Sequence, residues 1–447
     1  MKKLILASIC SCFFLISNAQ EEKMALSLDE AINFAIENSY NTKASKNDIK
    51  SATEKVWETT TIGLPQINGA IDYQNNLKQQ VSLLPAEITG GPAGTFTPVI
   101  FGTKQNIGAS ITLKQLLFDG SYLVGLQASR TYLKISKQAN EKTELLTREA
   151  VINAYGNVLV SENSISILEK NLKIIKKNLS DVKKIYENGL NEQEDIEQLE
   201  ITLGNLNSQL NSVKRMKGIA YKMLNLSIGN PIETELTLTD TLDSLVKNNI
   251  SLDIVSEEFS ISNHVDFKIA ENDRESKRLL LKLEKSKALP TLSAFVNYGT
   301  QGYSETFSFL KNEQEWFKSS LLGVSLNIPI FSSLGRSSKT KQATIALENA
   351  DIKLKETKQR LSLMAEKARN DYQLSIENYS TTKKNVGLAE RIENKQRIKF
   401  FEGLSSSFDL LQAQNQLYSQ QQNYIQSMLD VIAKKATLEN ALNIPIK

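Results

Sequence analysis

The chain contains two copies of one unit, and this internal repeat constrains its fold more than any other feature. The segment GLPQINGAIDY at 63–73 returns as ALPTLSAFVNY at 288–298, and YENGLNEQEDIEQLE at 186–200 returns as FFEGLSSSFDLLQAQ at 400–414. Further matched segments keep the same order in both halves, which predicts that the two halves fold alike. The offset is 225 at the first match and 214 at the second, so the first copy has the longer loop.

Four short stretches, two in each copy, alternate apolar and polar residues with the period of a β-strand. They lie at about 64–76, 105–118, 290–299 and 320–331. Each is roughly ten residues long, as in a tilted transmembrane strand, and one face is apolar, as in a barrel with lipid outside and water inside. A pair of half-buried hairpins on a soluble domain is the alternative. Candidate membrane-interface aromatics stand near the strand ends: Tyr73 and Tyr298 at one end, Phe118 and Phe331 at the other.

Long helices are predicted between these strand pairs. Residues 121–188 contain no proline, and their second half has apolar residues at coiled-coil spacing. A helix of 68 residues is roughly 100 Å long. Two shorter helices, at 28–61 and 190–226, have nearly the same combined length and can stack end to end beside it. The apolar seam consists of Ile165, Leu168, Leu172, Ile175, Leu179, Val182 and Tyr186.

The second copy repeats this plan with helices at about 336–402 and 404–443. Its seam is less regular, because Glu393 and Gln396 stand where the first copy has Leu179 and Val182. Between the copies, TELTLTD at 234–240 alternates in the same way and predicts a small strand.

The N-terminus has the pattern of a secretory signal peptide at 1–19, with two lysines, a short apolar run, and small residues at Ser17 and Ala19. Lipidation of Cys12 is the alternative. No later stretch offers the roughly 18 apolar residues of a membrane helix. The chain is therefore expected to be exported, and any membrane spanning must be done by strands.

The scarcity of chemically active side chains argues against an enzyme. The chain has one histidine, His264, and its two cysteines, Cys10 and Cys12, precede the expected cleavage site. Zinc chemistry, histidine-based triads and a disulfide framework are thereby disfavoured. The net charge of +3 gives no electrostatic case for nucleic acid. We expect no catalytic residue, metal site or cofactor, and no nucleic-acid partner.

Glycines mark the two reversals between long helices. Gly189-Leu190 and Gly403-Leu404 follow basic residues and precede acidic ones, as expected for helix ends. Each glycine is followed six residues later by an aspartate, Asp195 or Asp409. Helix-start electrostatics alone can account for these aspartates, and a pore-facing role is the second hypothesis.

Four strands cannot close a barrel, and an open sheet edge in lipid leaves backbone groups unsatisfied. Protomers must therefore combine their strands into one barrel, which has eight, twelve or sixteen strands for two, three or four protomers. Eight strands leave an interior filled by side chains, whereas twelve leave a lumen. The loop at about 78–104, rich in proline and glycine, is expected outside the cell and is a candidate constriction of the outer mouth.

Signal peptide, duplicated helix–hairpin–long helix–helix units and the glycine turns together resemble the TolC family of outer-membrane efflux proteins. The resemblance divides the chain into a first repeat at 20–233, a linker or equatorial segment at 234–262 and a second repeat at 263–447. It implies a mixed α/β membrane protein that forms a homotrimer. The trimer has a 12-stranded β-barrel in outer-membrane lipid, continuous with a long α-helical barrel in the periplasm of a Gram-negative bacterium.

The same resemblance implies a passive exit duct for small molecules or polypeptides, driven by an inner-membrane pump. A periplasmic membrane-fusion adaptor would contact the tip turns, Gly189-Leu190 and Gly403-Leu404. Asp195 and Asp409 would ring the closed entrance, and Gln412 stands at a ring position that is often acidic in relatives, so a cation-selective gate should be weaker. A periplasmic coiled-coil scaffold without a pore is the alternative. The sequence identifies neither the cargo nor the class of pump.

Overall fold

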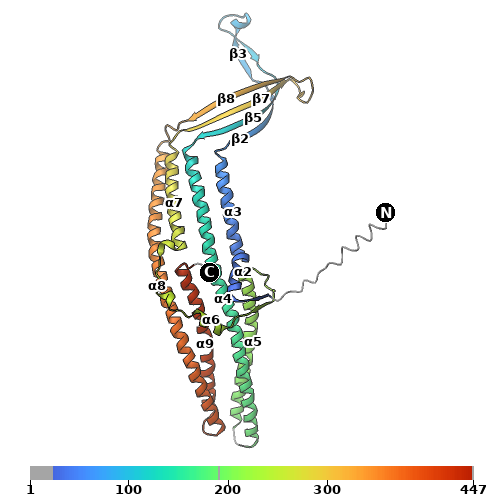
Figure 1. The fold of residues 1–447 in the computed structure, drawn as a ribbon. Helices are drawn as coiled ribbons and strands as arrows, with labels where there is room; N and C mark the ends of the chain where they lie inside the picture. The colour runs from blue at the N-terminus through green and yellow to red at the C-terminus, as the bar shows by residue number, and fades with distance from the viewer. Residues whose placement is uncertain (1–23, 190–191, 445–447) are drawn as a thin grey trace, which may run out of the picture. The chain divides into compact units, whose positions relative to one another are not determined.

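The computed structural model describes residues 24–189 and 192–444, and Figure 1 shows their fold. The signal peptide, Leu190 and the last three residues lie outside the described parts. The first repeat consists of β1 (Met24–Leu26), α2 (Leu28–Asn38), α3 (Tyr40–Thr61), β2 (Gln66–Asn75), β3 (Val81–Pro85), η2 (Ala86–Thr89), β4 (Phe96–Ile100), β5 (Gln105–Phe118), α4 (Gly120–Glu187) and α5 (Gln193–Ile228).

A short connecting region leads into the second repeat. It consists of β6 (Leu236–Leu238), α6 (Leu242–Asn249), η3 (Asp253–Val255) and η4 (Ile261–Asn263). The second repeat consists of α7 (Val265–Ser286), β7 (Thr291–Ser304), β8 (Trp316–Asn327), α8 (Gly335–Phe401) and α9 (Ser407–Ala441). The duplicated helix–hairpin–long helix–helix order predicted from the repeat is confirmed. No helix among the described residues is both long enough and apolar enough to cross a bilayer.

The chain forms two compact units, each assembled from both repeats. The sheet unit consists of residues 49–136 and 270–354, and the helical unit of the remaining described residues. Within the sheet unit, the hairpins of both repeats form one antiparallel sheet in the order β2-β5-β7-β8. The predicted strands of the two copies are thus joined by the pairing of β5 with β7 (Figure 1).

The register of this sheet places apolar residues of both repeats in common rows. Ile67 pairs with Leu113, Leu113 with Val296, and Val296 with Leu322. One residue further along β2, a second row starts at Asn68 and continues through Thr112 and Asn297. Because successive side chains of a strand point to opposite faces, the first row belongs to an apolar face and the second to a polar face.

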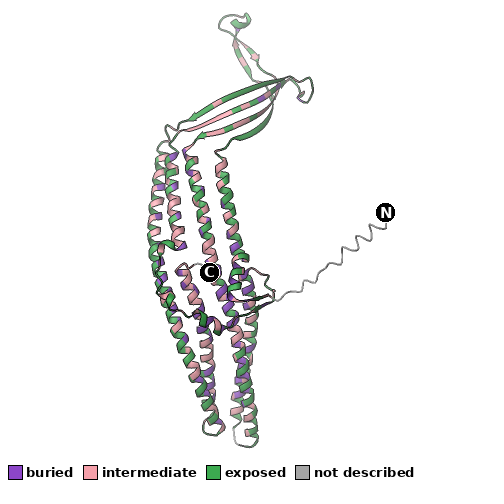
Figure 2. Cartoon of the chain, in the orientation of Figure 1, coloured by how far each residue is buried: buried purple, intermediate pink, exposed green. Residues whose placement is uncertain are grey.

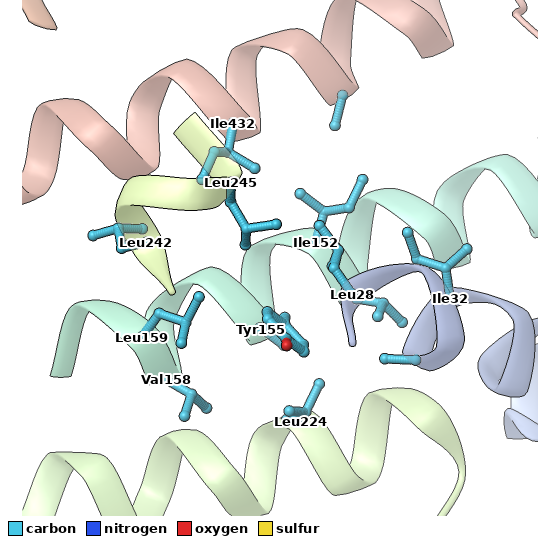
Figure 3. Packing of buried hydrophobic residues seen from close by; sticks show 14 of the residues in the cluster. Leu28, Ile32, Ile152, Tyr155, Val158, Leu159, Leu224, Leu242, Leu245 and Ile432 are labelled. Atoms are coloured by element: carbon cyan, nitrogen blue, oxygen red, sulfur yellow. The ribbon is translucent and has the colours of Figure 1, made fainter. Parts of the chain in front are cut away.

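The core of the helical unit surrounds Tyr155 of α4, which is fully buried (Figure 3). The Tyr155 hydroxyl donates to the Leu26 carbonyl at 3.0 Å and lies 3.0 Å from Asp240 Oδ2. Asp240 Oδ2 also accepts from the Leu28 backbone N–H at 2.7 Å. These bonds fix α4 against the parallel pair β1 and β6, the latter being the small strand predicted within 234–240. Burial of Tyr155 raises the pKa of its hydroxyl, which therefore stays protonated.

A second core joins the ends of α4 and α5. The predicted seam residues Leu168, Leu172, Ile175 and Val182 are buried there against Leu199, Leu206 and Leu210 of α5. The coiled-coil prediction is confirmed for these positions. Tyr186 is an exception, because it is 41% exposed at the last turn of α4.

The predicted helix at 28–61 is wrong in one respect, because it is broken at Ser39 into α2 and α3. Ser39 has ψ of 149°, outside the helical region, and its N–H donates to the Ala35 carbonyl. Its hydroxyl oxygen then accepts from the Thr42 N–H, which caps the start of α3. One serine thus ends the first helix and begins the second, a role that apolar periodicity does not reveal.

Candidate functional site

The apolar face of the sheet is exposed in the single chain. Every residue of β2 is exposed, and nearly every residue of β8 is (Figure 2). Leu322 in the middle of β8 is 74% exposed, and Ile71 of β2 is 76% exposed. So many exposed apolar side chains on one face need a cover of lipid or protein. Its large exposed side chains are Ile67, Ile71, Tyr73, Ile111, Val296, Tyr298, Leu322, Val324 and Leu326.

The opposite face is polar along most of its length. In the row that starts at Asn68, the Asn297 side-chain amide donates to Thr112 Oγ1 at 2.7 Å. Towards the loop end, a hollow on this face is lined by side chains that include Asp72, Gln74 and Gln301. A sheet with these two faces can separate an apolar medium from water.

Both edges of this sheet are open within the described chain. β2 pairs only with β5, and β8 pairs only with β7. Each edge strand therefore has backbone N–H and carbonyl groups without a ladder partner on its outer side. In water these groups can be solvated, but in lipid each would cost several kcal/mol.

Of the two aromatic residues predicted at the loop end of the strands, only Tyr73 lies there. It packs edge-on against Phe307 and Phe309 of the loop between β7 and β8, with ring centroids 5.9 Å and 6.0 Å away. Tyr298 is instead in the middle of β7, because that strand continues to Ser304 rather than ending at 299. The continuation has a partner, since β5 begins at Gln105 and pairs with it.

At the other end of the sheet, Phe118 is the last residue of β5 and is 43% exposed. Phe331 was predicted within the last strand, but β8 ends at Asn327. Pro329 explains the difference, because it has no N–H to donate to a strand ladder. Phe331 is 81% exposed in the segment before α8.

The glycine turns adopt the conformation expected from the sequence. Gly189 has φ of 76° and Gly403 has φ of 72°, in the left-handed region that glycine adopts without a Cβ penalty. The Leu404 N–H donates to the Lys399 carbonyl at 2.8 Å, which closes the end of α8. Leu404 is 77% exposed, whereas Leu190 lies outside the described residues.

Asp409 has a structural role at the start of α9. Its Oδ2 accepts from the backbone N–H of Ser406 and from the hydroxyls of Ser406 and Ser405. Hydrogen bonds from Ser406 hold the pKa of the Asp409 carboxyl below its usual value, so the exposed carboxylate is charged at neutral pH. The single hydroxyl hydrogen of Ser405 is shared with Gln396 Oε1 of α8, which also lies 3.2 Å from Ser405 Oγ. The aspartate thus combines helix capping with a negative charge near the turn.

Asp195 and Gln412 lie close to the equivalent turns. Asp195 is half-buried in the first turn of α5, and Gln412 is exposed three residues after Asp409 on α9. The two helix starts are linked, because Ser407 Oγ donates to Gln198 Oε1 of α5 at 3.2 Å. The structure therefore brings the predicted entrance residues of the two repeats to adjoining helix starts.

A buried polar cluster on α8 and α9 was not predicted as a site. Glu393 is 8% exposed and lies 3.8 Å from Arg397, measured from Oε1 to Nε. Burial is the main cause that raises the pKa of its carboxyl. Gln414 of α9 is 1% exposed. The irregular seam at Glu393 was a sequence signal for this cluster, whereas no pattern indicated that Gln414 would be buried.

Comparisons with known proteins agree with this architecture. A family model described as "Outer membrane efflux protein" matches residues 31–230 and 260–443. No curated protein sequence matches the chain significantly.

Solved outer-membrane proteins share the fold at low sequence identity. VceC from Vibrio cholerae has a TM-score of 0.72 at 14% identity, covering 94% of this chain and 97% of its own. The CmeC outer membrane channel of Campylobacter jejuni has a TM-score of 0.71 at 15% identity, with coverages of 93% and 85%. The MtrE outer membrane channel of Neisseria gonorrhoeae has a TM-score of 0.70 at 15% identity, with coverages of 93% and 88%. Since the matched residues make up most of the sequence, the chain belongs to the outer membrane efflux protein family.

Proposed function

We propose that three copies of the chain pool their strands into one twelve-stranded channel in the outer membrane of a Gram-negative bacterium. The observation that carries this proposal is the four-stranded sheet with one apolar face and two open edges. Lipid can cover the apolar face, but it cannot satisfy the edge strands β2 and β8. Joining β8 of one copy to β2 of the next satisfies both edges and closes the cylinder. Three copies give a strand number that leaves a water-filled lumen.

Unpartnered apolar stripes on the helices support the same assembly. Met216, Ile219 and Met223 of α5 recur at helical spacing, and each is more than half exposed. They lie apart from the buried seam of the same helix, which uses Leu199, Leu206 and Leu210. Contacts with neighbouring copies would bury the exposed stripe. The helices of three copies would then form the proposed periplasmic barrel.

Such a channel would act as a passive exit duct of a tripartite efflux or secretion system. The matched family is one of efflux channels rather than enzymes. Energy would therefore come from an inner-membrane pump, and a periplasmic membrane-fusion adaptor would join pump and duct. The exposed turns at Gly189 and at Gly403-Leu404 are suited to contact the adaptor, because they end the helical hairpins.

Asp195, Asp409 and Gln412 would surround the periplasmic entrance. Three copies would bring together three charged Asp409 carboxylates, which favour cations over anions in the entrance. Gln412 adds no charge at the next turn, so the preference should be modest. The bonds from Ser405 and Ser406 hold Asp409 in place without an ion pair.

Cell fractionation and gel electrophoresis test the proposed assembly. The duct requires the chain in the outer-membrane fraction, as a trimer that resists sodium dodecyl sulfate until it is heated. Purified trimer in a planar lipid bilayer should conduct ions. A monomer that is soluble without detergent and gives no conductance would instead support a periplasmic coiled-coil scaffold.

A further inference from the structure

The loop between β2 and β5 is folded into a second β-structure of its own. β3 and β4 pair antiparallel from Val81–Ile100 to Pro85–Phe96, and η2 forms the turn between them. The loop base is closed by the Asn76 N–H, which donates to the Lys104 carbonyl at 2.8 Å. We call residues 81–100 the outer ribbon. The second hairpin has no equivalent β-structure, because only residues 305–315 join β7 to β8.

One face of the outer ribbon is entirely apolar and uncovered in the single chain. The register and the alternation of side chains place Leu83, Phe96 and four other residues on this face. Leu83 is 64% exposed and Phe96 is 63% exposed. The opposite face carries the half-buried Leu84. The apolar face consists of Val81, Leu83, Pro85, Phe96, Pro98 and Ile100.

The ribbon carries almost no charge that would oppose contact with an identical ribbon. Between residues 79 and 103 the only ionisable side chain is Glu87. Its Oε1 accepts from the Gly94 N–H at 3.1 Å, so it is held within the turn of the ribbon. A surface that binds its own copy must not repel itself, and an uncharged apolar face meets that condition.

The connection of the ribbon to the sheet determines how many copies meet. Each chain has one ribbon, which is inserted next to the edge strand β2. The proposed trimer, on which this inference rests, therefore has three ribbons around one axis. Three ribbons, each with one apolar face, can pack around this axis with every apolar face on the inside. If the ribbons did not meet, their apolar faces would remain in water unless each ribbon bent into the membrane.

We propose that the apolar faces of the three outer ribbons dock against one another and close the outer mouth of the channel as a hydrophobic plug. Each apolar face would thus contact the corresponding apolar faces of the other two copies. A hydrophobic constriction excludes water and ions until the ribbons separate. The channel would then have an outer barrier, separate from the entrance near Asp409.

Adjacent leucines on opposite faces of β3 provide a matched test by cysteine crosslinking. Both natural cysteines precede the expected cleavage site, so the mature parent chain should have no thiol. The parent trimer is therefore the negative control. Leu83→Cys should form disulfide-linked dimers with an oxidant, and covalent trimers with a trifunctional maleimide. Leu84→Cys should give about tenfold less product, because its thiol points away from the contact. On β4, Phe96→Cys and Thr97→Cys repeat the comparison if a β3 variant assembles poorly.

Conductance supplies a second readout on the same trimers. Leu83→Asp places three carboxylates at the contact and should raise the mean single-channel conductance several-fold, whereas Leu84→Asp should leave it unchanged. The inference is overturned if stable trimers crosslink equally from both faces, or from neither. It is also overturned if Leu83→Cys reacts with a thiol probe confined to lipid, which would show a membrane-docked ribbon. A parent chain that forms no trimer overturns the proposed function as well, so the two failures are distinguishable.

Discussion

Arginine substitutions at two adjacent leucines of β8 test which face of the sheet contacts lipid. Leu322 belongs to the apolar row with Val296, whereas Leu321 pairs with Asn297 in the polar row. Both leucines are exposed in the single chain, at 74% and 58%, so neither substitution disrupts a packed core. The two variants change the same residue type to the same residue and differ only in the face that receives the charge.

The expected cost follows from the medium on each face. Arginine on the lipid face of a membrane strand costs about 2–4 kcal/mol at the bilayer midplane. Leu322 is in the middle of β8, so the upper part of this range applies most closely. A cost of about 2 kcal/mol lowers the folding equilibrium constant about 30-fold, and a cost of about 4 kcal/mol lowers it almost 1,000-fold. Leu321→Arg should cost less than about 1 kcal/mol, because its charge remains in the aqueous lumen.

The assay is refolding from urea into phospholipid vesicles. The folded fraction is measured as the trimer that resists sodium dodecyl sulfate before heating. Leu322→Arg should require a lower urea concentration for half-maximal folding than the parent chain, and Leu321→Arg should follow the parent. The reasoning is refuted if the two variants behave alike, or if Leu321→Arg is the more damaging.

Three further outcomes are expected. Gly229→Ala should destabilise the helical unit by at least about 2 kcal/mol, because φ is 87° and the new Cβ would lie 2.3 Å from the Asn38 carbonyl oxygen. Glu393→Gln should stabilise the chain at neutral pH by about 1 kcal/mol, measured as the temperature at which the trimer dissociates, because burial raises the pKa of the carboxyl and disfavours its charged form. Asp409→Asn should reduce the cation preference of single channels, measured from reversal potentials in a salt gradient.

Each of these outcomes has a control. Gly218 of α5 has open space where a Cβ would stand, so Gly218→Ala should be neutral or stabilising, and a loss equal to that of Gly229→Ala would contradict the geometric argument. For Glu393, the raised pKa means that its favourable contribution is full below about pH 4.5 and is lost as the pH rises. The benefit of Glu393→Gln should therefore disappear in acid. Unchanged selectivity in Asp409→Asn would leave this aspartate with its capping role alone.

The sequence predicted the structure best where apolar residues recur at one regular spacing along a long segment. The 4-3 spacing from Leu168 to Val182 identified the buried seam of α4, because burial against α5 imposes that spacing. Alternation identified the faces of the sheet for a similar reason. Ile67 and Leu322 come from different repeats, yet both belong to the row that the register places on the apolar face.

Local hydrogen bonds and partner strands limited the prediction of element ends. The break at Ser39 depends on one side chain that serves both helices. β7 continues past Tyr298 through Gly299 and Gly302, residues that suggest a turn, because β5 offers a partner there. The break at Ser39 and the extension of β7 both depend on specific hydrogen-bond partners, which the apolar pattern of a single segment does not reveal.

The candidate site was only partly predictable for the same reason. The turns at Gly189 and Gly403 were recognisable because a helix reversal requires a left-handed residue. The folded ribbon at 81–100 was not, because prolines and glycines concealed the alternation of two five-residue strands. Its apolar face depends on the register of the two strands, which places Leu83 opposite Pro98.

The most direct test of the proposed channel is a disulfide between the two open edges of the sheet. Within one chain, β5 and β7 separate β2 from β8, so their backbones are about 14 Å apart, too far for a disulfide. Cysteine at Ile71 is combined in turn with cysteine at Ser320, Leu322 or Val324, on the same face of β8. Oxidation should link three chains covalently at one of these registers. If every pair yields only monomers from membrane-inserted protein, the edges are not joined between copies and the channel proposal is contradicted.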